Sequence, residues 1–289
     1  KVDAKLSDNP KPLRGKVAVV TGASRGAGRG IALVLGEAGA TVYVTGRSVR
    51  GEATTDHLPG TIEETAEAVT GRGGVGIPVR CDATQDAQVE ALFKRIQSDG
   101  RLDIVVNNAW GGYEGYDGKT WADGTEFFAP FWEQSLQRWE GMFTAGVRSH
   151  LVASRCAVPL MLSQGQGLIV NTIAWDRDKY LGNLFYDMAK HAIARMTLAM
   201  ARDLEPYKIA AVAVAPGFMR TERVLDAPDV DLAETESTEY IGRAIAALAT
   251  DPNVLELSGT VLTVGDLAVE YGFTDIDGRQ IAAFRLEDM

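Results

Sequence analysis

Residues 21–30 read TGASRGAGRG and stand between a short apolar run, residues 17–20, and a helical pattern that begins at Ile31. A buried strand that turns through glycines directly into a helix leaves several backbone N–H groups pointing at one spot, at the positive end of the helix dipole. The strand before the glycines and the helix after them are the context in which this pattern is informative. The stretch therefore predicts a pyrophosphate-binding strand–turn–helix unit.

The glycines of this loop have separate structural uses. Gly22, Gly26 and Gly28 allow a tight turn, a close approach of the backbone to phosphate and close packing of the helix on the strand. Ser24 and Arg25 lie between them. We interpret these five residues as part of a cofactor-binding loop.

The end of the second predicted strand, residues 41–45, indicates which dinucleotide is bound. In dinucleotide folds an Asp or Glu about 20 residues past the glycines holds the ribose 2′-hydroxyl, whereas an Arg accommodates a 2′-phosphate. Arg47 occupies this place, and Arg25 can add a second positive charge. We predict NADP rather than NAD; the alternative is that both arginines are solvated surface residues.

The composition argues against several other functions. The net charge of −10 and the absence of clustered Lys and Arg argue against a nucleic-acid partner. No apolar run reaches the roughly 18 residues of a membrane span, so we expect no membrane partner. Cys81 and Cys156, the only cysteines, are too few for a disulfide framework or a zinc site. These features favour a cytoplasmic protein without a structural metal.

Apolar strand patterns alternate with helical patterns along the chain, which is typical of right-handed βαβ units in a parallel sheet. Thr61 and Glu64 form a capping-box pattern at the start of one of these helices. We predict a single doubly wound α/β domain over residues 1–289, a three-layer Rossmann fold with seven parallel strands in the order 3-2-1-4-5-6-7. Residues 1–14 are expected to be a flexible lead-in and residues 266–289 a C-terminal extension.

Asp82 stands just past the short third strand, and the sequence leaves two roles open for it. Its carboxylate can accept a hydrogen bond from an adenine amino group. It can also cap the N-terminus of the following helix. The two roles are compatible.

Four motifs resemble the short-chain dehydrogenase/reductase family in order and spacing: TGASRGAG at 21–28, Asn107-Asn108-Ala109, Tyr186-x-x-x-Lys190 and Pro216-Gly217. The resemblance covers residues from about 12 to 265. Within the family it is strongest to the branch typified by dehydrogenase/reductase member 1, through GQGLIV at 165–170 and EYGFTDIDGR at 270–279.

The resemblance implies an oxidoreductase that transfers hydride between NADP(H) and a carbonyl or secondary alcohol. Tyr186 and Lys190 are four residues apart and project from one helix face. A neighbouring ammonium favours the phenolate form, so Lys190 is expected to lower the pKa of Tyr186 below its ordinary value. By resemblance Tyr186 is the general acid/base, and Lys190 also binds the nicotinamide ribose.

Further cofactor contacts are implied by the same resemblance. Asn108 and Ala109 end the fourth strand, and Pro216 and Gly217 follow the sixth. Thr221 stands four residues after Gly217, where the family contacts the nicotinamide carboxamide. A simple turn would account for Pro216 and Gly217 but not for Thr221.

Two positions depart from the family pattern. The family usually places a Ser about a dozen residues before the Tyr, where its hydroxyl holds the substrate oxygen, but Ile173 and Ala174 stand there. Gly146 replaces an Asn that serves a proton relay in the family. Loss of one positioned donor typically costs about 10²–10³ in rate. A protein that binds NADP as a sensor or scaffold without turnover is therefore the competing hypothesis.

Three residues are candidates to replace the missing hydroxyl. Thr172 is nearest in sequence and is our first choice, although it should point to the opposite side of the strand from Ile173. Asp176 and Tyr180, in the charged loop that follows, are the alternatives.

Residues 110–139 are rich in aromatic side chains and glycine and follow a central strand. A loop there lies beside the crevice where open α/β sheets bind ligands. We interpret it as a wall of an apolar substrate pocket; the alternative is that its aromatic residues pack a subunit interface or cover a helix. Residues 220–237, which break at Pro228, are the expected flap over the substrate.

A long helix is expected over residues 139–162, which Pro159 must kink or close. In the resembled family this helix and the one after Tyr186 commonly pair between subunits. The resemblance thus implies a homodimer or homotetramer.

Overall fold

All strands of the described chain belong to one parallel sheet. The computed structural model describes residues 11–177, 179–226 and 232–286. The strands are β1 (Val17–Val20), β2 (Thr41–Gly46), β3 (Val75–Arg80), β4 (Ile104–Asn107), β5 (Gly167–Thr172), β6 (Ile209–Ala215) and β7 (Val261–Thr263). Their order is β3-β2-β1-β4-β5-β6-β7, which confirms the prediction.

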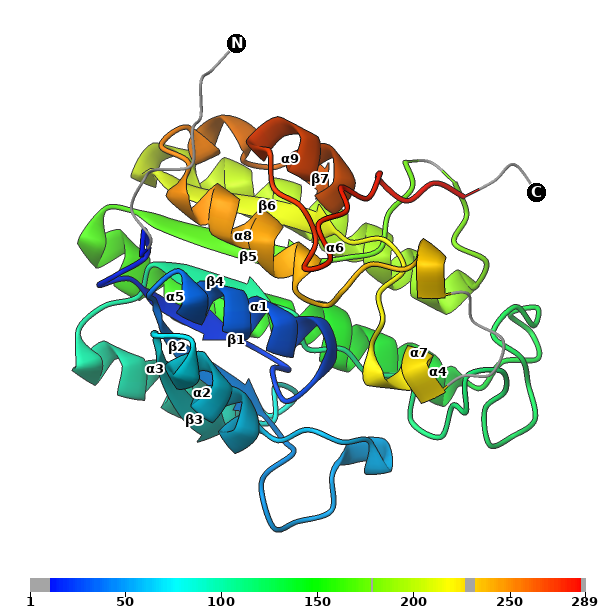
Figure 1. Cartoon of the computed structure of the whole chain (residues 1–289). Coiled ribbons are helices and arrows are strands. Elements are labelled where there is room, and N and C mark those ends of the chain that lie inside the picture. Colours follow the sequence, from blue (N-terminus) through cyan, green and yellow to red (C-terminus); the bar gives the residue numbers. More distant parts are fainter. Residues whose placement is uncertain (1–10, 178, 227–231, 287–289) are drawn as a thin grey trace.

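Helices cover both faces of this sheet (Figure 1). One layer contains α1 (Gly26–Glu37), α2 (Ile62–Gly71) and α8 (Tyr240–Thr250), and the other contains α3 (Asp86–Asp99), α5 (Ser149–Gln164) and α6 (Leu184–Leu204). Alternate residues of each strand face alternate layers, so Val20 packs on the first and Val19 on the second. The three-layer doubly wound fold is therefore as predicted.

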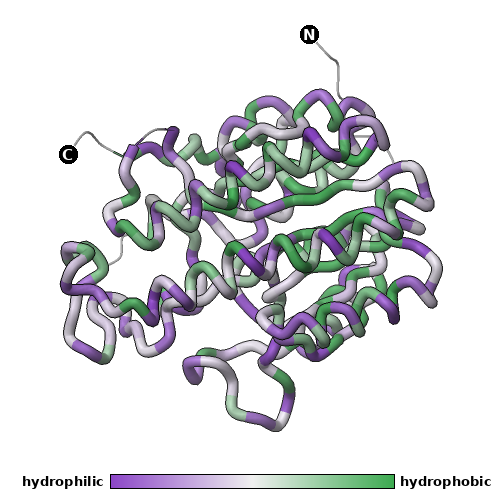
Figure 2. The backbone as a smooth tube through the Cα atoms, turned by 180° about the vertical axis from the view of Figure 1, so that it is seen from behind, coloured by the Kyte–Doolittle hydropathy of each residue, from purple (hydrophilic) through white to green (hydrophobic). Residues whose placement is uncertain are grey.

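Burial on both faces explains why the central strands are continuous apolar runs. All four residues of β4 and all seven of β6 are buried. β3 lies at the edge of the sheet and alternates between exposed and partly buried residues. In Figure 2 the central strands are coloured mostly as hydrophobic. No helix in the described ranges has the combination of length and apolar character that crossing a bilayer requires.

The long helix expected over residues 139–162 differs from the prediction. It consists of α4 (Leu136–Gly141), a π-helical segment (Met142–Arg148) and α5. Pro159 lies inside α5 and does not close it. Ala157 and Met161, which flank Pro159, are fully buried, and this packing holds the helix together despite one missing N–H donor.

Both predicted extensions contain ordered residues where the structure describes them. The side chain of Leu13 is 1% exposed, and its N–H donates to the carbonyl of Ala38, so residues 11–14 are packed rather than a flexible lead-in. Residues 1–10 lie outside the described residues. The C-terminal extension begins with α9 (Val264–Tyr271), which its sequence pattern did not indicate, and Asp275 beyond it is 1% exposed.

Short helical turns connect the main elements. The 3₁₀ turns are Thr55–His57, Glu205–Tyr207, Leu232–Glu234 and Val254–Leu257. The capping box predicted for α2 is present: the Thr61 side chain accepts from the N–H of Glu64, and the Glu64 side chain accepts from the N–H of Thr61. A five-residue helix, α7 (Glu222–Asp226), follows β6.

Candidate active site

A cavity of about 490 Å³ lies at the carboxyl ends of the central strands. This is the edge at which open α/β sheets bind their ligands. Every residue predicted to bind the cofactor, and Thr172 as the first choice for the missing hydroxyl, lines this cavity except Gly28. The lining members are Gly22, Ser24, Arg25, Gly26, Arg47, Asp82, Asn108, Ala109, Thr172, Tyr186, Lys190, Pro216, Gly217 and Thr221.

Hydrogen bonds join the glycine loop to the residues that follow β4. The Thr21 hydroxyl accepts the N–H groups of Asn108 and Ala109 at 2.9 and 3.0 Å, and the Asn108 amide donates to the carbonyls of Thr21 and Gly22. Gly28 lies behind this contact, where a Cβ would stand 2.2 Å from the Gly22 carbonyl oxygen. Gly28 therefore allows the helix to pack closely and does not itself face the ligand.

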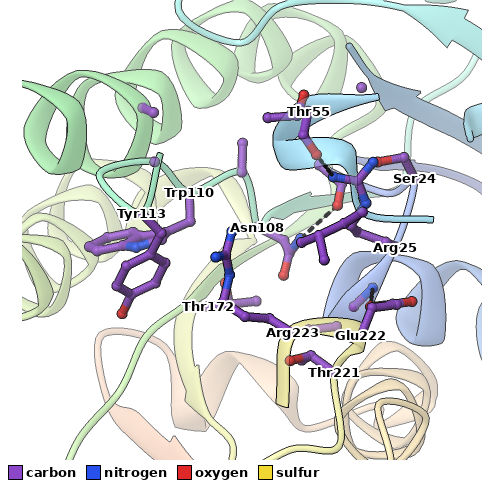
Figure 3. Close-up of a pocket in the computed structure, with 18 of the residues that line it drawn as sticks. Ser24, Arg25, Thr55, Asn108, Trp110, Tyr113, Thr172, Thr221, Glu222 and Arg223 are labelled. Atoms are coloured by element: carbon purple, nitrogen blue, oxygen red, sulfur yellow. Dashed lines mark hydrogen bonds between the residues drawn. The ribbon is translucent and has the colours of Figure 1, made fainter. Parts of the chain in front are cut away.

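The N-terminus of α1 holds a carboxylate in this structure. The N–H of Gly26, which has φ +56°, donates to Oε2 of Glu222 at 2.8 Å. Arg223, the next residue, forms an ion pair with Asp56 at 2.6 Å and donates to the carbonyl of Tyr116. Helix α7 is thus bound to the glycine loop through Glu222 and to residues 56 and 116 through Arg223; Figure 3 shows Glu222 and Arg223 at the cavity. The Gly26 N–H thus binds a carboxylate oxygen at the place where pyrophosphate binding was predicted, and pyrophosphate binding itself stays a prediction.

The two arginines proposed for cofactor selection have different surroundings. The Arg25 guanidinium donates to the Thr55, Pro59 and Gly60 carbonyls and to the Ser48 hydroxyl, which holds residues 48–60 against the glycine loop (Figure 3). Arg47 is exposed at the cavity and has no hydrogen bond or ion pair to a described residue. Arg25 is therefore mainly structural, and Arg47 is the arginine that a ligand can reach.

Asp82 does not cap helix α3. Its Oδ1 accepts from the N–H and the hydroxyl of Thr84 at 2.9 and 2.7 Å, while the N-cap position of α3 is Gln85. The carboxylate closes a local turn at the cavity wall. Thr221, on the opposite wall, accepts from the N–H of Val224 at 3.4 Å at the start of α7.

The first turn of α6 positions Tyr186. Asn183 caps this helix by accepting the N–H of Tyr186 at 3.1 Å, and the Asn183 amide donates to the Phe127 carbonyl. Lys190 lies one turn further on and is 7% exposed. Its Nζ stands 5.2 Å from the centre of the Tyr186 ring. The structure therefore brings this pair together at the cavity, as expected.

Burial governs the proton affinities of this pair. It raises the pKa of Tyr186 to about 12, an increase that the side chain of Tyr113 partly offsets. It also lowers the pKa of Lys190 to about 7, so the amine is only partly charged near neutral pH. The predicted lowering of the Tyr186 pKa by Lys190 is therefore not found: the loss of water around the phenol raises this pKa, and the side chain that lowers it is Tyr113.

Trp110 occupies the space that belongs to the family's Asn. A Cβ on Gly146 would lie 2.4 Å from Cζ3 of Trp110, so the glycine makes room for the indole. The opposite partner of this ring is Lys190, whose Nζ is 3.3 Å from the ring centre. Such a cation–π contact favours the charged amine. The glycine at position 146, where the family has Asn, therefore provides the space that Trp110 of the aromatic loop occupies.

Gly146→Ala is expected to lower the free energy of unfolding by about 1–3 kcal/mol through overpacking against Trp110. Alanine ordinarily stabilises a helix relative to glycine, so a decrease in the free energy of unfolding would itself indicate overpacking. Thermal unfolding would measure the effect, with Gly71→Ala as control because a Cβ there meets nothing within 4 Å. In the double variant, Trp110→Ala should remove most of the destabilisation that Gly146→Ala causes. If the effects of the two substitutions on the free energy of unfolding were simply additive, the contact between Gly146 and Trp110 would be contradicted.

The structure leaves the missing serine hydroxyl without a replacement on β5. Ile173 is buried against α6 residues, and Ala174 has only a methyl group. Thr172 lines the cavity but follows Leu168 and Val170 toward the α1 and α8 layer, away from the helix that holds Tyr186. The other two candidates do not line the cavity: Asp176 accepts from the N–H of Leu286, and Tyr180 is exposed.

The aromatic loop serves two of its predicted uses. Trp110 and Tyr113 line the cavity on the side opposite Arg25 (Figure 3). Other members pack against one another and against Phe143, Phe185 and Tyr186; they are Tyr116, Trp121, Phe127 and Trp139. Phe128, Phe131 and Trp132 are exposed. The loop is thus a wall of the cavity and a cover for the adjoining helix.

Residues 220–237 are anchored at both described ends. Arg220 lies 3.5 Å from Asp275, and the Glu236 N–H donates to the Phe218 carbonyl. Pro228, where the predicted flap breaks, lies outside the described residues. Sequence reasoning placed Tyr113 only within the aromatic loop and assigned no separate role to it. It missed Glu222 and Arg223, because the short helix α7 that carries them has no periodic pattern long enough to be recognised.

The chain belongs to the short-chain dehydrogenase/reductase family. The family model described as short chain dehydrogenase matches residues 16–229. Dehydrogenase/reductase SDR family member 1 from Mus musculus is 38% identical over 286 residues, covering 93% of this chain and 86% of that protein. The predicted family and branch are thereby confirmed, and the chain is related to oxidoreductases that use nicotinamide cofactors.

Solved structures agree with this assignment. A short chain dehydrogenase from Mycobacterium thermoresistibile superimposes with a TM-score of 0.78 at 25% identity, covering 96% of each chain. A 7α-hydroxysteroid dehydrogenase complexed with NADH and 7-oxo glycochenodeoxycholic acid has a TM-score of 0.71 at 25% identity, covering 90% of this chain and 96% of that one.

Proposed function

We propose that this protein is an NADP(H)-dependent oxidoreductase acting on a carbonyl or secondary alcohol of an apolar small molecule. The observation that carries the proposal is the meeting of Tyr186 and Lys190 with the glycine loop around one cavity. Phosphate-binding backbone at one end and a proton donor at the other suit a dinucleotide that reacts with a second molecule.

The residues of the cavity fit a nicotinamide dinucleotide. Lys190 is buried, reaches the cavity and has no hydrogen bond to a described residue, so its N–H donors suit ribose hydroxyls. The N–H of Gly26 already binds a carboxylate and suits a pyrophosphate. When bound, NADP(H) supplies or accepts hydride at C4 of the nicotinamide. Pro216, Gly217 and Thr221 would hold the carboxamide end.

Arg47 supports NADP over NAD. Its guanidinium is exposed at the end of β2 and has no partner among the described residues, whereas a carboxylate at this place would repel a 2′-phosphate. Arg25 contributes by fixing the loop that lies beside this phosphate site. Asp82, at the same wall, would accept from the adenine amino group.

Glu222→Gln is expected to raise the affinity for NADPH by about tenfold, equivalent to about 1.4 kcal/mol. The Glu222 carboxylate occupies the N–H of Gly26 and would repel a pyrophosphate there. Fluorescence titration with NADPH would measure the change. Glu140→Gln, the same charge change at an exposed position outside the cavity, is the control. Unchanged or weaker binding by Glu222→Gln would contradict competition at this site.

Tyr186 acts as the proton donor in this proposal. With its pKa at about 12 the phenol is protonated at neutral pH, which suits donation to a carbonyl oxygen during reduction. Lys190 orients the ribose and, when charged, favours loss of that proton. Trp110, Tyr113, Phe218 and Met219 line the cavity and favour an apolar substrate.

Turnover of aliphatic and aryl aldehydes and ketones with NADPH tests the proposal. We expect the native protein to oxidise NADPH in the presence of at least one member of the panel. Ala174→Ser, which adds the family's hydroxyl, separates the two hypotheses. Activity of Ala174→Ser alone would mean that the native protein is not an enzyme of this class.

An NADP-binding sensor or scaffold is the second candidate function. Ala174 favours it, because the family's hydroxyl is absent from β5. Tyr186 argues against a sensor or scaffold, since binding of the ribose needs Lys190 but not the Tyr186 hydroxyl. Tight NADPH binding without turnover of any carbonyl would support this candidate.

The homodimer or homotetramer implied by the family stays a prediction. Exposed apolar side chains on α5 and α6, namely Leu151, Leu162 and Met188, support it. The mass of the protein in solution, measured by light scattering, tests it, and a monomer mass would exclude it. The cytoplasmic location likewise stays a prediction.

A further inference from the structure

A carbonyl oxygen at Tyr186 needs a second hydrogen-bond donor. The oxygen gains negative charge as hydride reaches the carbon, and a positioned donor stabilises that charge. Tyr186 provides one donor, but Ile173 and Ala174, which follow the end of β5, carry no side-chain donor. Thr172 follows the alternation of β5 toward the other layer of the sheet. The second donor must therefore come from another element.

Tyr113 is the remaining hydroxyl on this wall of the cavity. It lines the cavity together with Tyr186, and the two ring centres are 6.4 Å apart at an angle of 32°. Trp110 contacts both rings, at 6.4 Å from Tyr113 and 5.5 Å from Tyr186. The Tyr113 ring thus lies beside the Tyr186 ring, and it enters the cavity from the aromatic loop next to Trp110 (Figure 3).

The backbone before Tyr113 is held firmly in place. Gly112 has φ +87°, and a Cβ there would stand 2.5 Å from Cγ of Met142 in the π-helical segment. The Gly112 N–H donates to Glu114 at 2.7 Å, and its carbonyl accepts from Nε1 of Trp121 at 3.2 Å. Because the backbone next to Tyr113 is fixed in this way, its hydroxyl would lose little conformational entropy on binding a substrate.

We propose that the Tyr113 hydroxyl holds the substrate oxygen beside Tyr186 and replaces the family's serine as a catalytic residue. This inference rests on the proposed function. It is consistent with the proton chemistry of the pair: burial keeps the pKa of Tyr113 well above its ordinary value, so the phenol remains a donor. The Tyr113 side chain also lowers the pKa of Tyr186, as a donor to its oxygen would.

The step balances with the groups named. The carbonyl oxygen accepts hydrogen bonds from Tyr113 and Tyr186. When bound, NADPH would supply hydride to the carbonyl carbon and would itself be oxidised to NADP⁺, so that the π electron pair would move to the oxygen held by Tyr113 and Tyr186. That oxygen takes the proton of Tyr186 to form the alcohol, while Tyr113 keeps its proton throughout. The Tyr186 phenolate regains a proton from solvent.

Tyr113→Phe provides the test, using the ketone that the native protein reduces fastest. We expect kcat to fall about a hundredfold, because one donor to the reacting oxygen is lost. NADPH affinity should not change, and the pKa of Tyr186 in the pH profile of kcat should rise. Tyr116→Phe is the matched control, because its hydroxyl donates to the Gly118 carbonyl and does not line the cavity.

Rescue distinguishes the inference from general damage to the loop. Ala174→Ser added to Tyr113→Phe should recover at least tenfold of the lost kcat, since a hydroxyl then reaches the oxygen from β5. Two outcomes would overturn the role of Tyr113 and leave the proposed function standing. One is a native kcat in Tyr113→Phe, and the other is a fall in kcat in Thr172→Val but not in Tyr113→Phe. Absence of turnover in the native protein would instead remove both.

Discussion

Tyr186→Phe is expected to lower kcat for carbonyl reduction by about 10²–10⁴-fold, the range associated with removal of a positioned general acid. The phenylalanine ring keeps the edge-on contacts that Tyr186 makes with Trp110 and Phe127, with ring centres 5.5 and 5.7 Å apart. The fold and the affinity for NADPH should therefore be preserved. Initial rates with a fixed ketone and a fluorescence titration with NADPH would separate the two effects.

Tyr180→Phe is the control for this substitution. Tyr180 is 56% exposed, lies six residues earlier and does not line the cavity, so its kcat should equal that of the native protein. Retention of more than a tenth of the native kcat by Tyr186→Phe would show that another group protonates the substrate. In that case Tyr113, which is also in the cavity, would be the first residue to examine.

Arg47→Asp is expected to weaken NADP binding about a hundredfold and to leave NAD binding nearly unchanged. A charge-assisted hydrogen bond is worth about 1.5–3 kcal/mol, and each 1.4 kcal/mol is tenfold in affinity. The introduced carboxylate would in addition repel the 2′-phosphate and suit a 2′-hydroxyl. Calorimetric titration of the native and variant proteins with both nucleotides would measure the selectivity.

Arg50→Asp is the matched control, with the same change of charge three residues away. Arg50 forms an ion pair with Glu67 at 2.7 Å and does not line the cavity, so the ratio of NADP to NAD affinity should stay as in the native protein. Equal affinity of the native protein for the two nucleotides would contradict a 2′-phosphate site at Arg47.

Local patterns made much of the fold predictable. The runs of apolar residues in β4 and β6 reflect burial of these strands on both faces. A strand buried on both faces must consist mostly of apolar residues, so it can be recognised from its composition alone. The capping box of Thr61 and Glu64 involves residues three apart, so its geometry follows from local sequence. Pro159 was predicted to kink or close its helix. It does not close the helix, because packing of its neighbours in the core outweighs the lost hydrogen bond, and a kink there stays a prediction.

The site was predictable where a motif occupies a strand end. Asn108 reaches the cavity because it follows the carboxyl end of β4, and parallel strands present these ends at one edge of the sheet. Tyr186 and Lys190 reach the same cavity from the first turns of α6, one helical turn apart. Residues in irregular loops were not predictable. Arg25 is bound to residues 48–60, and this contact depends on a loop conformation that no periodic pattern specifies.

The amino-acid sequence by itself determined the position of the glycine loop, because this depends on local periodicity and on spacing along the chain. It also determined the family and, through the resemblance to that family, the order of the strands. Only the tertiary structure decided what stands around Tyr186. Trp110 fills the space above Gly146, Tyr113 faces the phenol, and burial raises the pKa of Tyr186 to about 12. Desolvation and contacts between distant segments arise only when the loops have packed, and they set the chemistry of the cavity.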